Sequence, residues 1–357
     1  MTPLFRSASR AKILFALIAF TLASASSARA QLTFTFNHAA DIDPRALAGF
    51  QEAAARWSFI FNDSINVSLN IGFQTLGTGI LGSTSTTRGT IPYYAYKAYL
   101  AADSTSPADR LAVSSLPSGS SFNLLLNRTN NSPFESGSAT PYLDNDGDAN
   151  NSYIRLTLAD ARALGLYQAS GGLADASITF SSTFNFDFNP DDGIASNAID
   201  FVGVATHEIG HALGFTSGVD TLDNLTSPAP DNALTYVSPL DLYRYSTASY
   251  ADSSIDWTAD KRTKYFSIDG GKTPLALFST GAVNGDGRQA SHWKDNYGFG
   301  IMDPTTAYGE LDKISSLDIT ALDVIGFNVA IPEPSTYGIL GALLLLSAVV
   351  IRRKRTR

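Results

Sequence analysis

The sequence predicts a mixed α+β fold with much irregular structure, on two observations. The first is composition, because 28 of the 33 acidic residues are Asp and the chain also has 28 Gly. Asp and Gly favour turns and helix caps, whereas Glu, of which there are five, favours exposed helix faces. The second is the order of the periodic segments, in which short strands come before and after a helix. The 357 residues are enough for one large domain with a buried core.

The first half of the chain is predicted to contain strands and one long helix. Pro44 opens a segment whose apolar residues recur at helical spacing as far as Trp57, and Asp43 is a suitable N-cap. Residues 76–90 are rich in Gly, Ser and Thr and predict a loop or an edge strand, and residues 156–166 predict a short helix. Alternating apolar residues predict strands at 34–36, 65–73 and 176–180.

The second half of the chain is predicted to contain two helices separated by an irregular region. The first helix spans about residues 201–215 and precedes an insertion, residues 221–290. The second spans residues 316–325, with Ser316 as its cap and Gly326 at its end. The inner face of that helix consists of Leu317, Ala321, Leu322 and Ile325.

Residues 1–30 are typical of a secretory signal peptide. Basic residues lead into an apolar run from Ile13 to Phe20. Ala28-Arg29-Ala30 then fits a cleavage site, so the mature chain is expected to begin near residue 31. The alternative is an uncleaved membrane anchor, for which the apolar run is short.

Residues 331–357 have three parts in a fixed order. Pro332-Glu333-Pro334 is followed by an apolar stretch over 337–351 and then by the basic cluster RRKR. These are the properties of a stiff spacer, a short transmembrane segment and a positive cytoplasmic stop, so a plain tail anchor is one interpretation. The order also resembles the PEP-CTERM sorting signal of Gram-negative bacteria. The resemblance implies recognition by an exosortase at the inner membrane and export to the cell surface or an exopolysaccharide matrix.

The charge and the lack of Cys exclude several function classes. Nine of the 25 Lys and Arg and one of the 33 Asp and Glu lie in the two end segments, which leaves 16 basic and 32 acidic residues in the body, residues 31–330. A net charge of about −16 repels phosphate backbones and anionic headgroups, which excludes nucleic-acid binding. Without Cys, disulfides, thiol nucleophiles and zinc sites with thiolate ligands are also excluded.

Two clusters of Asp have the composition of calcium loops. The first contains Asp144, Asp146 and Asp148, and the second contains Asp187 and Asp191. In the first cluster the Gly is at the fourth position instead of the sixth, so the segment is not an EF-hand. Acidic surface turns are the simpler explanation of both clusters, and calcium binding stays open as the alternative.

The segment His207-Glu208-Ile209-Gly210-His211 carries the strongest chemical signal. Two His four residues apart on a helix project from one face, so both rings can bind one metal ion. Glu208 follows the first of them, where a carboxylate can take the proton of a water activated by the metal. Imidazole ligands in a site without redox chemistry favour zinc.

A catalytic zinc site needs a third protein ligand and one open position. From the residues alone, two candidates remain: Asp220, which is close in sequence, and His292, which lies 81 residues after His211. Met302 follows ten residues later in the segment GIMDP, and it is the one Met besides the initiator. On its own it would be a core side chain, but in a tight turn after a ligand it is typical of a Met-turn beneath a zinc site.

Together these motifs resemble the leishmanolysin group of metzincin zinc peptidases. The matching features are HEIGHALGF at 207–215, SHW at 291–293, the turn at Met302 and SLDITALDVIGF at 316–327. The resemblance implies a metzincin-like fold, with a twisted mixed sheet and the active-site helix in an N-terminal subdomain. The C-terminal subdomain is then irregular, with the Met-turn and the terminal helix at 291–327. Because this group takes its third ligand from a His after a long insertion, the resemblance implies His292 for that role.

The expected function is that of a secreted zinc-dependent endopeptidase that acts on a protein or peptide, with Glu208 as general base. The same resemblance makes Tyr308 a candidate donor to the oxyanion of the transition state. The alternative is a non-catalytic surface or matrix protein whose metal site is structural and closed by four protein ligands.

Overall fold

The computed structural model describes residues 31–167 and 172–330. The predicted signal peptide and the predicted sorting segment therefore lie outside the described residues. In the described part of the chain, no helix has the length and apolar character that a membrane crossing requires.

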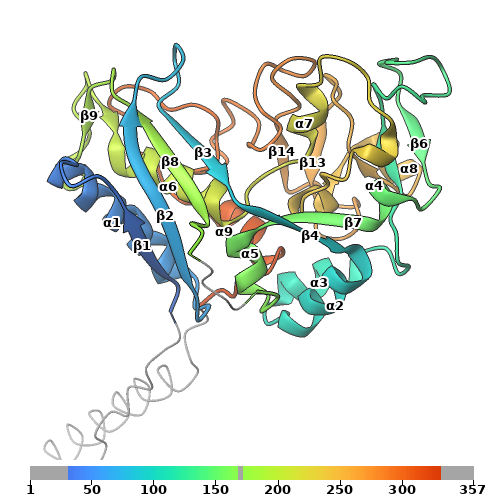
Figure 1. Cartoon of the computed structure of the whole chain (residues 1–357), viewed down its shortest axis with the longest axis horizontal. Helices are drawn as coiled ribbons and strands as arrows, with labels where there is room; N and C mark the ends of the chain where they lie inside the picture. The colour runs from blue at the N-terminus through green and yellow to red at the C-terminus, as the bar shows by residue number, and fades with distance from the viewer. Residues whose placement is uncertain (1–30, 168–171, 331–357) are drawn as a thin grey trace, which may run out of the picture. The chain divides into compact units, whose positions relative to one another are not determined.

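The fold is α+β, as the sequence predicts (Figure 1). The helices are α1 (Pro44–Ile60), α2 (Tyr93–Asp103), α3 (Pro107–Ser115), α4 (Ala149–Ser152), α5 (Leu158–Ala163), α6 (Phe201–Leu213), α7 (Val219–Asp223), α8 (Thr247–Ala251) and α9 (Ser316–Asp323). The strands are β1 (Thr33–Asn37), β2 (Asn66–Gln74), β3 (Gly82–Thr86), β4 (Arg88–Pro92), β5 (Leu124–Leu126), β6 (Tyr142–Asp144), β7 (Tyr153–Thr157), β8 (Ala176–Ser181), β9 (Phe186–Asp187), β10 (Ile199–Asp200), β11 (Arg244–Tyr245), β12 (Ile255–Asp256), β13 (Lys264–Phe266) and β14 (Ala276–Phe278).

The largest sheet is mixed and has the strand order β1-β2-β8-β3. Strands β1, β2 and β8 are parallel neighbours, and β3 is antiparallel to β8 at the edge. Helices α1 and α6 pack against each other, and α6 also packs against β3 and β8 (Figure 1). Between them, the rings of Phe50, Phe180 and Phe201 meet with centroids 4.6–5.2 Å apart. This core fixes α6 relative to the edge strand.

Helix α1 confirms the predicted helix and its cap. Asp43 accepts a hydrogen bond from the backbone N–H of Arg45 at 2.8 Å, and Pro44 occupies the first helical position. The apolar face of the helix is buried, and the indole of Trp57 donates to the carbonyl of Thr206 at 2.9 Å. One side chain thus ties α1 to the middle of α6.

The remaining strands form small separate sheets: β4-β7, β9-β10, β11-β13-β14 and β5 between β12 and β6. The helix predicted over 156–166 is wrong in its first part, because Leu156 and Thr157 belong to β7 and the helix begins only at Leu158. Pairing of β7 with β4 buries Ile154 and Leu156, which outweighs their local helical spacing. Thr157 then caps α5 by accepting from the backbone N–H of Asp160.

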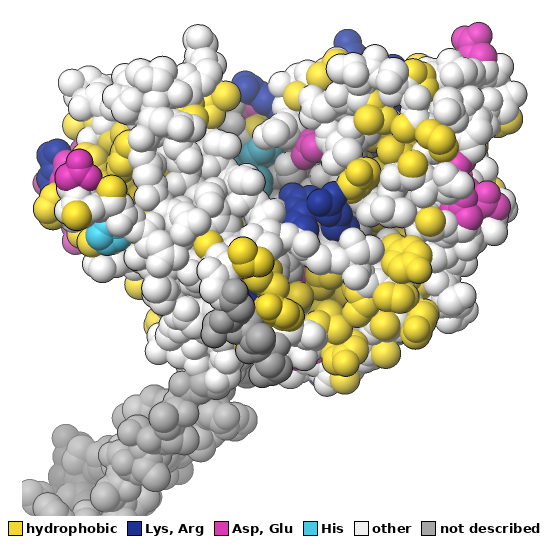
Figure 2. Space-filling view, viewed as in Figure 1, with side chains coloured by type: hydrophobic (Ala, Val, Ile, Leu, Met, Phe, Trp, Pro, Cys, Tyr) yellow, Lys and Arg dark blue, Asp and Glu magenta, His cyan; other side chains and the backbone are white. Residues whose placement is uncertain are grey.

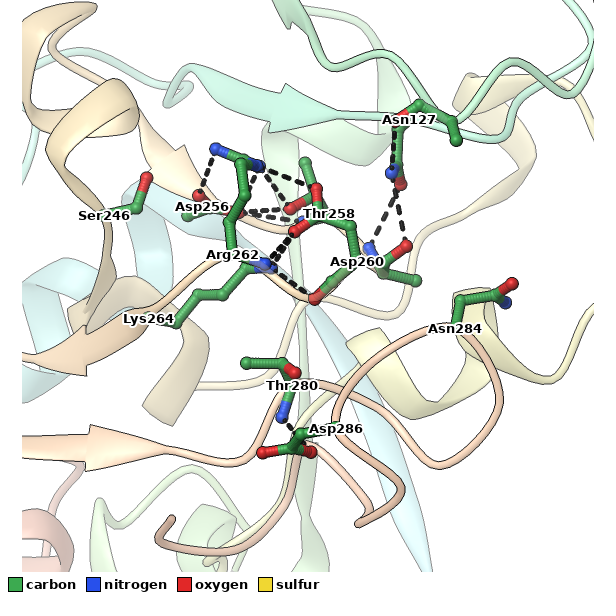
Figure 3. Close-up of polar contacts among 12 residues, drawn as sticks. Asn127, Ser246, Asp256, Thr258, Asp260, Arg262, Lys264, Thr280, Asn284 and Asp286 are labelled. Atoms are coloured by element: carbon green, nitrogen blue, oxygen red, sulfur yellow. Dashed lines mark hydrogen bonds and ion pairs between the residues drawn. The ribbon is translucent and has the colours of Figure 1, made fainter.

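A network of buried charges holds part of the insertion together (Figure 3). Arg262 pairs with Asp256 at 3.3 Å and with Asp260 at 2.9 Å. The fully buried ammonium of Lys264 pairs with the same Asp260 and also donates to its backbone carbonyl at 2.9 Å. Buried charges are costly unless they are paired, so these contacts explain why the segment keeps one conformation. The side chain of Asn127, just after β5, accepts a hydrogen bond from the N–H of Ala259 and donates one to its carbonyl, which anchors the network.

Candidate metal centre

Helix α6 carries the HExxH segment; it begins at Phe201, as the sequence predicts, and ends at Leu213, two residues before the predicted end. Asp200 caps its start by accepting from the N–H of Gly203 at 2.8 Å. The residue after the helix, Gly214, has a φ of 141°, which residues other than Gly rarely adopt. His207 and His211 lie one turn apart on the helix and face the same cleft.

Three imidazole rings converge on one point. The Nε2 atoms of His207 and His211 are 3.1 Å apart, and the Nε2 atom of His292 lies 3.2 Å from each. The structure therefore brings together the three His that the sequence and the resemblance favoured. The alternative ligand, Asp220, is not part of this group.

Backbone carbonyls fix which ring nitrogen carries the proton. The Nδ1 atoms of His207 and His211 lie 2.7 Å from the carbonyls of Ile301 and Phe215, and His292 Nδ1 lies 3.3 Å from that of Gln289. A carbonyl only accepts hydrogen bonds, so each Nδ1 carries hydrogen and each Nε2 offers a lone pair to the common point. Three lone pairs at this distance repel unless a cation lies between them.

The rings stay neutral, as metal ligands must. Burial lowers the pKa of His207 to about 4. Burial and the neighbouring His207 lower the pKa of His211 to about 3, and burial and the two other rings lower that of His292 far below its usual range. Three nitrogens bound to one zinc ion at about 2.0–2.1 Å and tetrahedral angles lie about 3.3 Å apart, close to the spacing seen here. The residues present fit a metal ion.

Asp220 lies outside the cluster of three His and holds the segment that carries His292. Its carboxylate accepts from the N–H of Ala290 at 2.6 Å, from the N–H of Ser291 at 3.2 Å and from the hydroxyl of Ser291 at 2.5 Å. The backbone carbonyl of His292 itself accepts a hydrogen bond from the N–H of Ser279 at 3.0 Å. These bonds hold the backbone on both sides of the imidazole.

Met302 packs beneath the metal centre. It is fully buried, and a Cβ built on Gly210 would lie 2.5 Å from its sulfur. Gly at this position therefore lets the helix and the Met turn approach closely. The N–H groups of Ile301 and Met302 donate to the carboxylate of Asp318, which also accepts from the indole of Trp293 at 2.8 Å. Asp318 thus joins the Met turn to the segment that carries His292.

Asp318 belongs to the start of α9, where the structure corrects one expectation. The cap of this helix is Ser315 and not Ser316, because the Ser315 hydroxyl accepts from the N–H groups of Leu317 and Asp318. In turn, the carboxylate of Asp318 accepts a hydrogen bond from the N–H of Ser315, which completes a capping box. The same carboxylate therefore caps a helix and braces the metal site.

Glu208 faces the cleft beside the three rings and is held by the edge strand. The hydroxyl of Thr84 on β3 lies 2.6 Å from Oε2 of Glu208 and 3.0 Å from its carbonyl. A Cβ built on Gly82 would lie 2.6 Å from Oε1, so the strand backbone closely approaches the other oxygen. Burial raises the pKa of Glu208 to about 7, and the bond from Thr84 opposes this shift.

The metal centre lies in a cleft of about 660 Å³. Most residues from Gly79 through β3 line the cleft, as do residues 287–289, 291–292, 300–301 and 303–306. Figure 2 shows the hollow with His side chains inside it and a group of Lys or Arg side chains beside it. The cleft is large enough for several residues of an extended peptide.

Tyr308 and the two clusters of Asp do not lie with the three His. Tyr308 is 56% exposed and is not among the residues that line the cleft, so its role as an oxyanion donor stays a prediction. Within the described residues, the three His are the one set of three or more His, Asp or Glu whose ligand atoms lie within 4.8 Å of one another. Asp144, Asp146, Asp148, Asp187 and Asp191 form no such set. Calcium binding by them also stays a prediction.

The Asp residues of the two clusters mainly serve local turns. Asp144 accepts from the side chain of Asn150 at 2.7 Å, and Asp187 accepts from the N–H groups of Asn189 and Ala195 at 3.1 and 3.0 Å. These contacts are those of acidic turns.

Comparison of the chain with protein-family models, with curated proteins and with solved structures gives no match.

Proposed function

We propose that this protein is a zinc-dependent endopeptidase. The observation that carries the proposal is the convergence of three histidine Nε2 atoms beside the carboxyl of Glu208 in an open cleft. Three protein ligands leave one position for a reacting molecule, which is typical of catalytic zinc, whereas structural zinc has four protein ligands. Neutral imidazoles as the ligand set favour zinc.

The chain's own residues divide the chemistry between them. His207, His211 and His292 would hold the metal, which when bound polarises a carbonyl oxygen and makes water more acidic. Glu208 takes a proton from the attacking water and delivers it to the leaving amine. Among the described residues, β3 is an edge strand that pairs only with β8 and lines the cleft, so an extended peptide could pair with its other side.

The non-catalytic alternative would need a closed ligand shell. Asp220 was the residue that could close it, but three hydrogen bonds from residues 290 and 291 occupy its carboxylate. A glutamate facing the cleft beside three ligands also has no structural purpose in that alternative. From the two end segments alone, we further propose that the protein is exported and sorted by an exosortase to the cell surface or an exopolysaccharide matrix.

Removal of the metal separates the two functions. The purified protein is treated with a chelator, and peptide cleavage and circular dichroism are followed together before and after zinc is restored. A catalytic metal predicts that cleavage is lost while the fold is retained, and that added zinc restores cleavage. Unfolding on metal removal, or cleavage that survives it, contradicts the proposal.

A further inference from the structure

Arg88 is a basic residue of the cleft that makes no ion pair with any other described residue. It follows β3 at the start of β4 and lines the cleft together with Glu208 and His211. Its Nε donates to the hydroxyl of Thr86 at 2.7 Å. Within residues 31–167 and 172–330, its two terminal nitrogens have no hydrogen-bond partner and Arg88 makes no ion pair.

A second arginine without an ion pair lies next to it. Strands β4 and β7 are antiparallel, with Arg88 opposite Thr157 and Thr90 opposite Arg155. Arg88 and Arg155 are therefore diagonal neighbours on one face of this ladder. The guanidinium of Arg155 lies 4.9 Å from the ring centre of Tyr236 and, in the described part of the chain, pairs with no carboxylate. Burial and the charge of Arg155 both lower the pKa of Arg88.

The two carboxylates that interact electrostatically with Arg88 already accept hydrogen bonds from other groups. Asp220 and Asp241 are the two acidic residues whose charge stabilises the Arg88 cation. Asp220 is bound by residues 290 and 291, and Asp241 accepts from Ser217 Oγ, Gly218 N, Ser238 N and Trp257 Nε1. By contrast, Arg288, the other basic residue that lines the cleft, pairs with Asp295 at 3.0 Å.

Two adjacent arginines that make no ion pair among the described residues are unexpected in a body that carries twice as many acidic as basic residues. Like charges repel, and partial burial adds a desolvation cost. A bound anion would offset these costs, because a guanidinium fork matches a carboxylate with two parallel hydrogen bonds.

We propose that Arg88, which lines the cleft, and Arg155, its neighbour on the β4-β7 ladder, form an anion subsite that binds a carboxylate of the peptide substrate near the scissile bond. This inference rests on the proposed peptidase function. The carboxylate has two sources, an acidic side chain of the substrate or its C-terminus, and both present the same group to the arginines.

The position of the subsite follows from the edge strand. Thr84 on β3 contacts Glu208, and Arg88 lies four residues further along the chain, just beyond the end of β3 at Thr86. The side chain of Arg88 lines the same cleft as Glu208 and His211. A peptide paired with β3 across Glu208 would therefore place a carboxylate a few residues from the scissile bond within reach of Arg88.

Quenched fluorescent peptides test the subsite. One series places Glu or Gln at each of the four positions on either side of one cleavable bond, all with amidated C-termini, and a second series varies only a free against an amidated C-terminus. At one or two adjacent positions, kcat/KM is expected to be about tenfold or more higher for Glu than for Gln. If the C-terminus is the source, the preference appears in the second series instead.

Arginine variants assign the preference. In Arg88→Gln and Arg155→Gln, the Glu-to-Gln ratio of kcat/KM is expected to fall toward one, and in Arg88→Glu a Lys peptide should become the better substrate. Arg110→Gln is the matched control, because Arg110 is exposed on α3 and bonds only the carbonyl of Thr105. Metal content and thermal unfolding of each variant show that it is folded.

Each outcome either supports the anion subsite or overturns it. A ratio near one in both peptide series, or a preference that survives in both arginine variants, overturns it. If the wild-type protein cleaves no peptide, the peptidase proposal fails. The subsite is then tested by fluorescence anisotropy of labelled Glu and Gln peptides with the zinc-loaded protein, and equal affinities overturn it.

Discussion

The hydroxyl of Thr84 donates a hydrogen bond to Oε2 of Glu208 at 2.6 Å, although 124 residues separate the two in sequence. Thr84 belongs to the edge strand along which a substrate would lie, and Glu208 belongs to the helix that carries His207 and His211. In the proposed mechanism, the contact would link substrate binding and the general base within a single pair of side chains. Thr84 would then be a positioning residue.

Replacing Thr84 by Val removes this bond and preserves the shape of the side chain. We expect kcat to fall by about tenfold, because one hydrogen bond to a carboxylate fixes the orientation of the base. Thr84→Ser keeps the hydroxyl and should retain most of the activity. The check is steady-state kinetics at equal metal content, and a Val variant as active as the Ser variant would exclude a positioning role.

Gly210→Ala is expected to destabilise the protein although Ala is the better helix former. The added Cβ would meet the buried sulfur of Met302 at 2.5 Å, and overpacking of this kind costs about 1–3 kcal/mol, against about 1 kcal/mol gained in helix propensity. Denaturant unfolding should show a net loss for this variant. The matched control is Gly72→Ala, where a Cβ meets nothing within 4 Å and stability should change by less than about 0.5 kcal/mol. Equal stability of the two variants would contradict the packing argument.

His292→Ala and Asp220→Asn are expected to differ in metal affinity. Loss of the third ligand should weaken zinc binding by well over a hundredfold, whereas loss of the residue that positions it should cost about 10–100-fold. A competition titration with a chromophoric chelator measures both constants. If Asp220→Asn abolished binding while His292→Ala bound like the wild type, the assignment of the third ligand would be wrong.

Because of the buried carboxyl of Asp323, the free energy of unfolding is expected to fall as pH rises. Burial raises its pKa from 3.8 to about 7. Below about pH 4 the carboxyl is protonated in both states, and as pH rises toward 7 the unfolded chain releases the proton first, so the free energy of unfolding falls. Three pKa units correspond to at most about 4 kcal/mol.

Asp323→Asn keeps the shape of the protonated carboxyl and removes this titration. The wild type should therefore lose stability relative to the variant between about pH 4 and pH 8, as measured by denaturant unfolding at several pH values. A difference between the two proteins that is constant across this range contradicts the assignment.

The sequence predicts the elements with strong local patterns and the residues of the HExxH segment. Helix α1, with Asp43 and Pro44 at its start, and helix α6 depend on periodicity and capping chemistry that lie within the element itself. The β4-β7 ladder is different, because its stability comes from pairing between segments about 65 residues apart. Local spacing in 156–166 therefore predicted helix where the first residues form a strand.

The residues that support the site are harder to find from sequence than the metal ligands. Thr84, Asp220 and Asp318 act across distances in the chain that no local pattern records. For Asp318 one signal exists, since Ser315-x-x-Asp318 has the spacing of a capping box. For Asp220, closeness in sequence to the second His suggested a ligand, whereas the carboxylate turns to the backbone of residues 290 and 291.

The most direct measurement is cleavage of an unfolded protein by the zinc-loaded wild type beside the Glu208→Gln protein, with zinc content measured in both. The account predicts one zinc per chain in each protein, cleavage by the wild type, and a rate lower by about 10²–10⁴-fold in the variant. Equal rates in the two proteins, or no cleavage by a wild type that holds its zinc, would contradict it.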